Sequence, residues 1–299
     1  MCIFLREKRN GNHSAFTLVE ILVVIAVIGL LSSIIFAITR GADEQGRIAK
    51  GLYFSQHLHN SLGSYAAGIW NFDEGSGTAA NDISGWNNNG SLVNSPTWRC
   101  AATDTNYTPS AQGCSLEFNG STQYVNLGNG TSLQPTTAIT LEVWVKADDL
   151  SGNRRLLSNR YMPGFLGNYA SWLNPKVVFV VNTAGTSLSM SSDSSVFVDR
   201  WTHIAMVYDG ETGYVYINGN LDKEDATPAG NIDARTGVLY LGRREDGVEL
   251  FSGLIDEVRI YSTALTAAQI RDQYYAGLQN LLARNHISKQ EYQERSVMY

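Results

Sequence analysis

The strongest pattern in the chain is an apolar run at residues 16–38. Its 23 residues contain a single charged side chain, that of Glu20. A helix of this length, rising about 1.5 Å per residue, spans about 35 Å and matches the roughly 30 Å hydrocarbon core of a bilayer. The pattern therefore predicts a membrane span. Its N-terminal end should lie in the cytoplasm, because three basic residues precede it, namely Arg6, Lys8 and Arg9.

A polar stretch at 40–64 follows the apolar run and keeps a helical spacing of apolar residues, which are Ile48, Leu52, Leu58 and Leu62. Each glycine in this stretch weakens a helix by up to about 1 kcal/mol relative to alanine. We expect one long helix over 16–66, whose distal half packs on the domain that follows.

From Gly68 onwards, short β-rich segments alternate with clusters of Gly, Asn and Asp, a pattern typical of a sandwich or barrel. The segment 139–146 alternates strictly and places Ile139, Leu141, Val143 and Val145 on one face. Further strands are predicted at 201–208, 214–217, 238–241 and 254–261, with a hairpin turn at 209–213.

Two helices are predicted after the strands. The first carries an apolar stripe, formed by Ala267, Ile270, Tyr274, Leu278 and Leu281, that should pack on the β-domain. The second is short and polar, at 288–295. The tail from Asn285 onwards is either a subunit contact or solvated.

Composition excludes two broad classes of protein. Hydrophobic residues make up 43% of the chain and charged residues only 17%, so it can form a substantial core and is not a disordered chain. The formal net charge is −6, and basic residues do not cluster after the first ten residues, so nucleic acid is not an expected partner.

No catalytic motif is present. The chain lacks a Gly-x-Ser-x-Gly sequence, a phosphate-binding Gly-Lys-Ser/Thr loop and a His-Glu-x-x-His sequence. His57 and His59 are two apart on a predicted helix and face different ways, and His203 alternates with apolar strand residues, which favours a structural role. We therefore predict that the protein is not an enzyme.

The N-terminal sequence SAFTLVEILVVIAVIGLL, at 14–31, resembles the class III signal of type IV pilins and pseudopilins. The resemblance implies that prepilin peptidase cuts between Ala15 and Phe16 and methylates the new amine of Phe16. The family usually has Gly where this chain has Ala15. A carboxylate inside a spanning helix costs a few kcal/mol unless it has a partner. In the family, the residue matching Glu20 neutralises the terminal amine of a neighbouring subunit. A plain signal anchor is the alternative.

A second resemblance covers roughly residues 68–278. It is carried by WNFDEGSG at 70–77, DISGWNNNG at 82–90, LEFNG at 116–120, WTHIAMVYDG at 201–210 and LIDEVRIY at 254–261. These motifs are similar to laminin-G-like, concanavalin A-like domains. The resemblance implies a mainly β fold, an antiparallel jelly-roll sandwich, that binds carbohydrate or matrix glycans, often beside calcium. The expected organisation is a leader at 1–15, a pilin-like helix at 16–66, a jelly-roll at 67–265 and a helical tail at 266–299.

Two cysteines remain once the leader, which holds Cys2, is removed. Cys100 and Cys114 close a loop, and in an exported protein a disulfide between them is the default expectation. Metal binding by this pair is the weaker alternative.

Calcium needs about six to eight oxygen ligands, and two clusters are candidates. The first combines Asp82, the loop 87–89, Asn119 and Asp256. Alternation along 254–261 puts Asp256 on the face of Val258 and Ile260, where its carboxylate would need a cation or hydrogen-bond donors.

The second candidate calcium cluster resembles the position where pentraxin relatives hold calcium. It is formed by Glu245, Asp246 and Glu249, near Asp148, Asp149 and Asn153. Arg243 and Arg244 adjoin it, so simple salt bridges are the alternative for this cluster, and solvated acidic loops remain the alternative for both.

A sugar would be bound by exposed aromatic rings that stack on its pyranose face. The candidates lie in or near predicted loops, although each could instead be a core or rim residue: Trp86, Tyr161, Phe165, Tyr169 and Trp172.

These patterns lead to one main hypothesis. The chain is expected to be a pilin-like subunit, anchored and polymerised through its N-terminal helix, that displays an adhesive jelly-roll head outside the cell. Its partners would be prepilin peptidase, other pilin subunits, the membrane and an extracellular glycan or matrix ligand. The alternative is a monomeric membrane-anchored lectin that uses the helix only as a tether. A polysaccharide-acting enzyme is disfavoured, because no paired acids in a cleft can be named.

Overall fold

The computed structural model describes residues 18–32, 62–100, 108–109, 113–159, 169–183, 185–226, 229–234, 237–283 and 287–297. The chain forms two units, Met1–Gly46 and Arg47–Tyr299. In the first unit a helix covers residues 18–32, and its apolar side chains are exposed. None of the described helices combines the length and the apolar character that a membrane crossing requires.

The predicted helix over 16–66 is described only at 18–32 and near its end. The rest of that prediction lies outside the described residues. At its end, a single turn η1 (Gly63–Tyr65) leads directly into strand β1 (Ala66–Trp70). The strands of the second unit therefore begin at Ala66.

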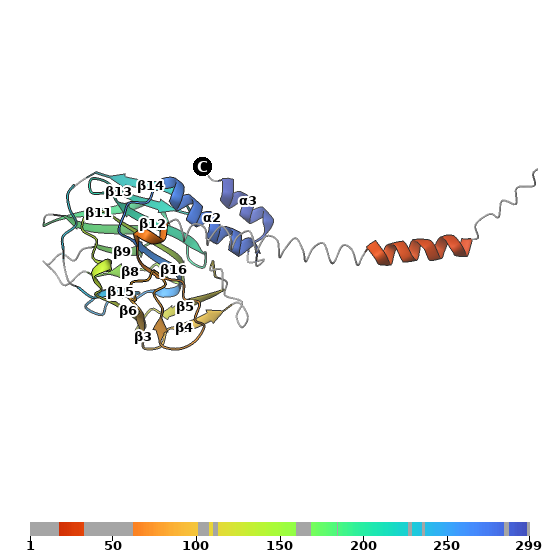
Figure 1. Ribbon diagram of the computed structural model, residues 1–299, viewed down its shortest axis with the longest axis horizontal. Coiled ribbons are helices and arrows are strands. Elements are labelled where there is room, and N and C mark those ends of the chain that lie inside the picture. The colour runs from red at the N-terminus through yellow and green to blue at the C-terminus, as the bar shows by residue number, and fades with distance from the viewer. Residues whose placement is uncertain are drawn as a thin grey trace, which may run out of the picture. The chain divides into compact units, whose positions relative to one another are not determined.

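The second unit is built from two packed antiparallel sheets (Figure 1). The first sheet has the order β14-β13-β12-β7-β16-β5-β4, and β1 pairs with β16. Its other strands are β14 (Asn220–Asp225), β13 (Gly213–Ile217), β12 (Thr202–Tyr208), β7 (Ile139–Ala147), β16 (Ser252–Tyr261), β5 (Cys114–Asn119) and β4 (Thr97–Cys100).

The second sheet has the order β11-β10-β9-β8-β15-β6-β3-β2. Its strands are β11 (Thr186–Ser195), β10 (Lys176–Thr183), β9 (Tyr169–Asn174), β8 (Arg154–Ser158), β15 (Leu239–Leu241), β6 (Tyr124–Gly128), β3 (Gly90–Val93) and β2 (Ala79–Ala80), and a short turn η2 (Thr131–Leu133) follows β6. The jelly-roll sandwich predicted from the sequence is confirmed.

The alternation in β7 is confirmed as well. Ile139, Leu141, Val143 and Val145 are fully buried in the core between the two sheets. The predicted hairpin joins β12 to β13, and the carboxylate of Asp209 accepts hydrogen bonds from the backbone N–H groups of the turn at 2.7 and 2.9 Å. This is the local turn chemistry that Asp provides.

Two C-terminal helices belong to the same unit, and α2 (Ala267–Ala283) covers the outer face of the first sheet (Figure 1). Thr266 and Gln269 form a reciprocal capping box at the start of α2. The predicted stripe is buried except for Ala267, which is exposed. At Gly277 a Cβ atom would come within 2.5 Å of the Trp144 ring, so this close approach requires glycine. Helix α3 (Lys289–Val297) follows.

Strand β16 contains a β-bulge that changes which of its side chains face the core. Asp256 lies opposite Trp144 of β7, and beyond it two residues, Glu257 and Val258, stand against one residue of β7. Glu257 has a φ of +51°. The prediction that Asp256 shares a face with Val258 and Ile260 is wrong, because the inserted residue shifts the alternation by one. Asp256 is buried on the outer face beside Trp144, while Val258 and Ile260 remain in the core.

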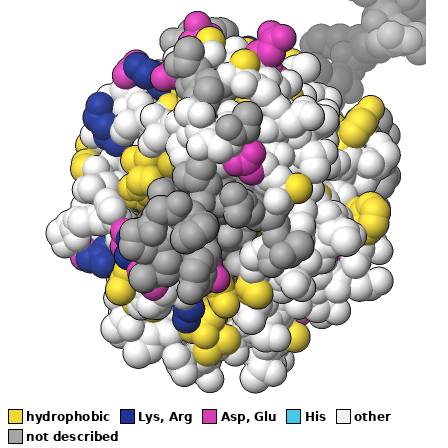
Figure 2. Space-filling view, turned by 90° about the vertical axis from the view of Figure 1, so that its left-hand side faces the viewer, with side chains coloured by type: hydrophobic (Ala, Val, Ile, Leu, Met, Phe, Trp, Pro, Cys, Tyr) yellow, Lys and Arg dark blue, Asp and Glu magenta, His cyan; other side chains and the backbone are white. Residues whose placement is uncertain are grey.

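Charged side chains of opposite sign are mixed on the surface. On the face drawn in Figure 2, basic and acidic side chains lie beside one another along one margin, and hydrophobic side chains are scattered. The coloured side chains of this face form no continuous basic area, in agreement with the net charge of −6.

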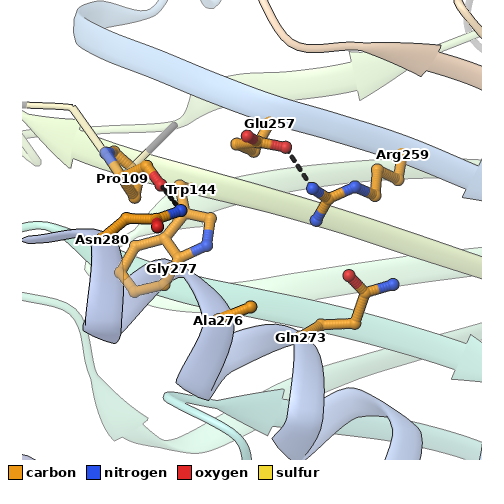
Figure 3. A pocket seen from close by; sticks show the side chains of 8 residues that line it. All are labelled: Pro109, Trp144, Glu257, Arg259, Gln273, Ala276, Gly277 and Asn280. Atoms are coloured by element: carbon orange, nitrogen blue, oxygen red, sulfur yellow. Dashed lines mark hydrogen bonds and ion pairs between the residues drawn. The ribbon is translucent and has the colours of Figure 1, made fainter. Parts of the chain in front are cut away.

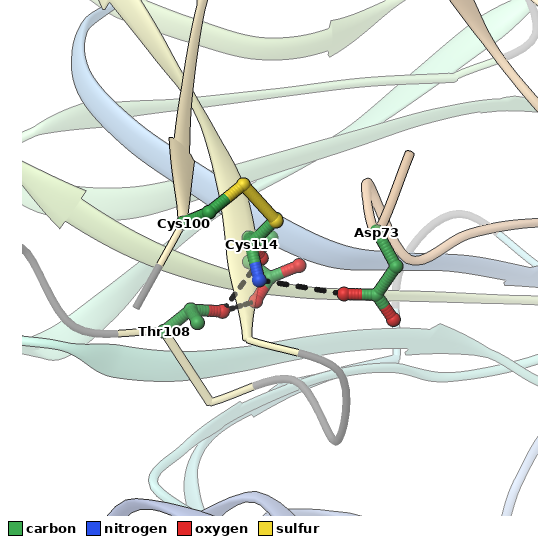
Figure 4. The surroundings of a disulfide bond; sticks show 5 residues. Asp73, Cys100, Thr108 and Cys114 are labelled. Carbon is green, nitrogen blue, oxygen red and sulfur yellow. Dashed lines mark hydrogen bonds between the residues drawn. A yellow bond between two sulfur atoms is a disulfide. The ribbon is translucent and has the colours of Figure 1, made fainter. Parts of the chain in front are cut away.

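The expected disulfide between Cys100 and Cys114 is present and joins β4 to β5 (Figure 4). Two polar contacts surround it. The N–H of Cys114 donates to Asp73 at 3.4 Å, and the hydroxyl of Thr108 donates to the carbonyl of Cys114 at 2.8 Å. The covalent link and these contacts hold the start of β5 in place.

Replacing both Cys100 and Cys114 with Ser should lower the free energy of unfolding by about 3 kcal/mol, because the bond closes a loop of about 15 residues in the unfolded chain. Urea denaturation of the full chain in detergent measures this change. Dithiothreitol should lower the stability of the wild type and leave the double variant unchanged. A double variant as stable as the wild type would contradict the prediction.

Candidate functional site

A groove of about 410 Å³ lies where the edge strands of both sheets meet the C-terminal helices. β14 is the edge of the first sheet and β11 the edge of the second. The groove is lined by the end of β11, the loop 196–202, the turn before β14 and β14 itself, with Tyr274 from α2 and Arg295 from α3. Its volume falls in the range of about 300–1,000 Å³ that small ligands occupy.

Apolar side chains are exposed in this groove. Phe197 is 66% exposed and Leu221 is 51% exposed. The loop that carries Phe197 is tied to the sheets by its backbone: the N–H of Val196 donates to Pro175 and the N–H of Asp199 donates to Ala147, at 2.9 and 2.8 Å. The aromatic ring is therefore presented by an anchored loop.

Polar groups line the same groove. The carboxylate of Asp222 is among them and accepts hydrogen bonds from the backbone N–H groups of Asp193 and Ser194 at 2.6 and 3.1 Å. Ser195 and Asn220 add a hydroxyl and an amide to the lining. Asp222 thus holds the end of β11, and the neighbouring side chains provide donors and acceptors.

Two arginines supply positive charge. Arg295 is 4% exposed, donates from Nη2 to the carbonyl of Trp201 at 2.9 Å, and lies 3.5 Å from Glu291. Its Nε atom is buried without a hydrogen-bond partner. Arg200 is exposed at the groove. An exposed ring, hydroxyl and amide groups, and guanidinium groups together suit a polar ligand that also has an apolar face.

The loop 243–249 brings together several residues singled out from the sequence. The guanidinium of Arg243 lies between the rings of Tyr124 and Tyr240, 4.1 and 4.5 Å from their centroids. On the neighbouring strands, Arg155 lies 4.4 Å from the ring centroid of Trp172. These aromatic rings on the outer face of the second sheet are therefore stacked against arginines.

Two members of the second predicted calcium cluster, Asp246 and Glu249, are paired with arginines in or beside this loop. Arg244 forms ion pairs with Asp246 and Glu249, both at 2.6 Å, and Arg155 also pairs with Glu249. Asp149 pairs with Arg154. These are the ion pairs that the salt-bridge alternative predicts.

Of the first predicted calcium cluster, the structure brings Asp82 and the loop 87–89 together but separates Asn119 from Asp256. Asp82 accepts hydrogen bonds from the N–H groups of Ile69, Ser84 and Asn88. The side chain of Asn119 caps its own turn at 121–123 and lies opposite Ser252 in β16. Asp256 is four residues further along that strand, a distance of about 13 Å at 3.3 Å per residue. Nowhere in the described parts of the chain do three His, Cys, Asp or Glu side chains come together as a metal site.

The aromatic residues proposed as sugar ligands differ in exposure. Tyr169 is fully buried, and its hydroxyl donates to the carbonyl of Leu133 at 3.0 Å. The expectation that it stacks on a sugar is wrong, because its position in β9 points it into the core. Trp172 is partly exposed, and Trp86 is 59% exposed. Tyr161 and Phe165 lie outside the described residues.

A layer of buried polar side chains separates the first sheet from α2. Glu142 in β7 and His203 in β12 are fully buried, with 3.9 Å between Oε1 and Nε2, and their polar atoms have no hydrogen-bond partner. Burial raises the pKa of Glu142 to about 8, which Arg259 opposes, and burial lowers the pKa of His203 to about 3. Both side chains are therefore mostly uncharged at neutral pH. His203 packs against the rings of both Trp144 and Tyr274, as expected for a structural residue.

Figure 3 shows a small cavity in this layer, between Glu257 and Arg259 of β16 and the residues of α2. Glu257 forms an ion pair with Arg259, and Asn280 donates to the carbonyl of Pro109 at 3.2 Å. The cavity volume of about 20 Å³ is enough for about one water molecule. The layer therefore holds α2 on the sheet and leaves no space for a larger ligand there.

The predicted processing residues lie at the other end of the chain. Glu20 is on the helix of residues 18–32 and is exposed. Ala15 and Phe16 lie outside the described residues.

Sequence reasoning did not find Phe197, Arg200 and Arg295. A local indication existed, because an aromatic residue followed by Asp199 and Arg200 between two strands is typical of an exposed loop. The contribution of Arg295 had no local indication, since it depends on how α3 packs.

Two family models match the chain. The concanavalin A-like lectin/glucanases superfamily matches residues 119–271, and the prokaryotic N-terminal methylation motif matches residues 10–36. Both resemblances drawn from the sequence are confirmed. No curated protein matches the chain.

Solved structures share the sandwich. Domain 4 of AbnA, an extracellular arabinanase from Geobacillus stearothermophilus solved with arabinotriose, has a TM-score of 0.51 and 21% identity over 69% of this chain and 97% of its own length. The receptor-binding domain of botulinum neurotoxin C/D mosaic serotype has a TM-score of 0.54 and 13% identity over 73% of this chain and 52% of its own length.

The ligand-binding domain of botulinum neurotoxin serotype D, solved with N-acetylneuraminic acid, has a TM-score of 0.52 and 14% identity over 74% of this chain and 53% of its own length. This chain thus spans about half of the toxin domains. At these identities the likeness establishes the fold.

The variant E142Q should lose less stability than the wild type as the pH rises. The carboxyl has its ordinary pKa of 4.5 in the unfolded chain and a pKa of about 8 in the fold. Between these values only the folded protein keeps the proton, so stability falls as pH rises, by at most about 1.4 kcal/mol per pH unit. Urea denaturation from pH 5 to 8 should give a shallower decline for E142Q than for the wild type.

The matched control is E211Q, because Glu211 is exposed in the hairpin turn at 209–213 and its replacement should keep the wild-type slope. Equal slopes for the wild type and E142Q would mean that this burial does not govern stability.

Proposed function

The chain belongs to the concanavalin A-like lectin/glucanases superfamily, and on that premise we propose that it is a carbohydrate-binding subunit displayed at the cell surface by a prepilin-type N-terminus. The observation that carries the proposal is the presence of both motifs in one chain, at 10–36 and 119–271. The solved complexes of similar folds with arabinotriose and N-acetylneuraminic acid support a sugar as the class of ligand.

The groove between β11, β14 and the C-terminal helices is the proposed binding site. Phe197 offers a ring on which a pyranose can stack, and Ser195 and Asn220 offer hydrogen bonds to sugar hydroxyls. Hydrolysis of glycosidic bonds normally uses two carboxyl groups. Among the described residues that line the groove, Asp222 alone has a carboxylate, and this group already accepts backbone hydrogen bonds, so binding is favoured over catalysis.

The N-terminus is proposed to act as in type IV pilins and pseudopilins. Prepilin peptidase would cleave after Ala15, and the methylated amine of Phe16 would pair with Glu20 of a neighbouring subunit. The helix would anchor the subunit in the membrane before assembly, with the second unit outside. A monomeric lectin that uses the helix only as a tether needs neither the cut nor Glu20.

Protein recovered from its native membrane should begin at N-methylated Phe16, as shown by intact mass and N-terminal sequencing. The variant E20A should still be processed but should not enter sheared filaments, because the terminal amine of its neighbour loses its counter-charge. S32A, on the same helix, is the control and should assemble. A chain that still begins at Met1 would contradict the pilin assignment. If E20A is displayed at the cell surface without assembling into filaments, the monomeric tethered lectin would be favoured.

Full-length protein in detergent should bind a subset of glycans on an array, and F197A should lose up to about tenfold in affinity, because a stacked aromatic ring contributes about 0.5–1.5 kcal/mol. W86A is the matched control, since Trp86 is exposed but does not line the groove. Loss of binding in W86A alone would place the sugar at the loop 84–89 instead. A flat array profile would contradict carbohydrate binding.

A further inference from the structure

We propose that the groove recognises an acidic saccharide, a sugar whose carboxylate is bound by Arg200. The inference rests on the proposed function, that this groove binds carbohydrate, and adds the chemical class of the sugar. Three features carry it: the balance of charge in the groove, the position of Phe197 beside Arg200, and the rigidity of their loop.

The groove is positive in a negatively charged protein. The whole chain has a net charge of −6, but two guanidinium groups and one carboxylate line the groove. That carboxylate, of Asp222, is already used by two backbone N–H groups, and the nearby Asp193 is paired with Lys223 at 3.1 Å. The carboxylates of Asp222 and Asp193 are therefore occupied.

Arg200 is available to a ligand. It is exposed and forms no ion pair with another described residue. Both arginines also line a neighbouring cavity of about 260 Å³, in which Arg295 is paired with Glu291. The guanidinium of Arg200 presents a planar pair of donors that fits a carboxylate.

Phe197 and Arg200 are three residues apart on one anchored loop. The backbone hydrogen bonds of Val196 and Asp199 bracket Phe197, and Asp199 has a φ of +56°, a conformation that only a defined turn maintains. Ring and guanidinium are thus presented by one fixed turn. An acidic sugar has both an apolar ring face and a carboxylate, whereas a neutral sugar would leave Arg200 without a partner.

The test uses full-length protein in detergent and oligosaccharides that end in galacturonate or glucuronate, each compared with its methyl ester. The ester keeps the ring and hydroxyls and removes only the charge. Calorimetry should give at least about tenfold tighter binding for the acid than for the ester, as expected for a charge-assisted hydrogen bond. Added salt should reduce this difference, because the groove is open to solvent.

Variants separate charge recognition from folding. R200Q should lose the preference and bind the acid and the ester with equal affinity. R200K should recover part of the preference, since it keeps the charge but not the planar pair of donors. R271Q is the matched control, because Arg271 is exposed on α2 outside the groove, and it should bind like the wild type. Thermal melting checks that each variant is folded.

The outcomes distinguish this inference from the proposed function. Equal affinity for acid and ester, with both lost in F197A, would overturn the acidic class while leaving carbohydrate binding in place. An equal loss for acid and ester in R200Q would also overturn it, because Arg200 would then shape the groove rather than bind the carboxylate. If none of the probes and no glycan on the array binds, both proposals fail.

Discussion

The packing of α2 on the outer face of the first sheet is the contact on which the rest of the second unit depends. At Gly277 the helix approaches the ring of Trp144 so closely that no side chain fits between them, and Trp144 in turn stacks on Tyr274 at 5.7 Å. Because of this contact, the first sheet is buried on both faces, on the inner face by the second sheet and on the outer face by α2. The polar side chains of the outer face then have to remain uncharged or form pairs.

Burial on both faces explains the unusual chemistry of this layer. Glu142 keeps its proton at neutral pH, His203 stays neutral, and Glu257 pairs with Arg259. The bulge at Asp256 has a role here, because it keeps Val258 and Ile260 in the inner core while Asp256 joins the outer layer, where its carboxyl group contacts the hydroxyl of Thr108. The layer therefore determines where α2 packs on the sheet and does not itself form a binding site.

The same helix builds the groove. Tyr274 lies in the wall of the groove, and its hydroxyl donates to the carbonyl of Arg295 at 3.3 Å, which joins α2 to α3. Arg295, which follows Arg200 by about 95 residues in the chain, therefore contributes its guanidinium group at the edge of the sandwich. A ligand in the groove would contact both edge strands and the C-terminal helices, so the tail that follows the jelly-roll is part of the proposed binding surface rather than an appendage.

The amino-acid sequence by itself determined the architecture, the strands around 139–146 and 254–261, the apolar stripe of α2, the cysteine pair and the prepilin-type N-terminus. These features follow from local periodicity and from motifs whose spacing is short. Tertiary structure alone decided that Tyr169 is a core residue, that Asp246 and Glu249 are paired with arginines, and that Asp256 faces outward. It also decided that Phe197, Arg200 and Arg295 line one groove. The physical reason is that a β-bulge exchanges the two faces of a strand, and that ion pairs form between residues on distant strands and helices. A repeat of 2 or 3.6 residues along the sequence predicts neither effect.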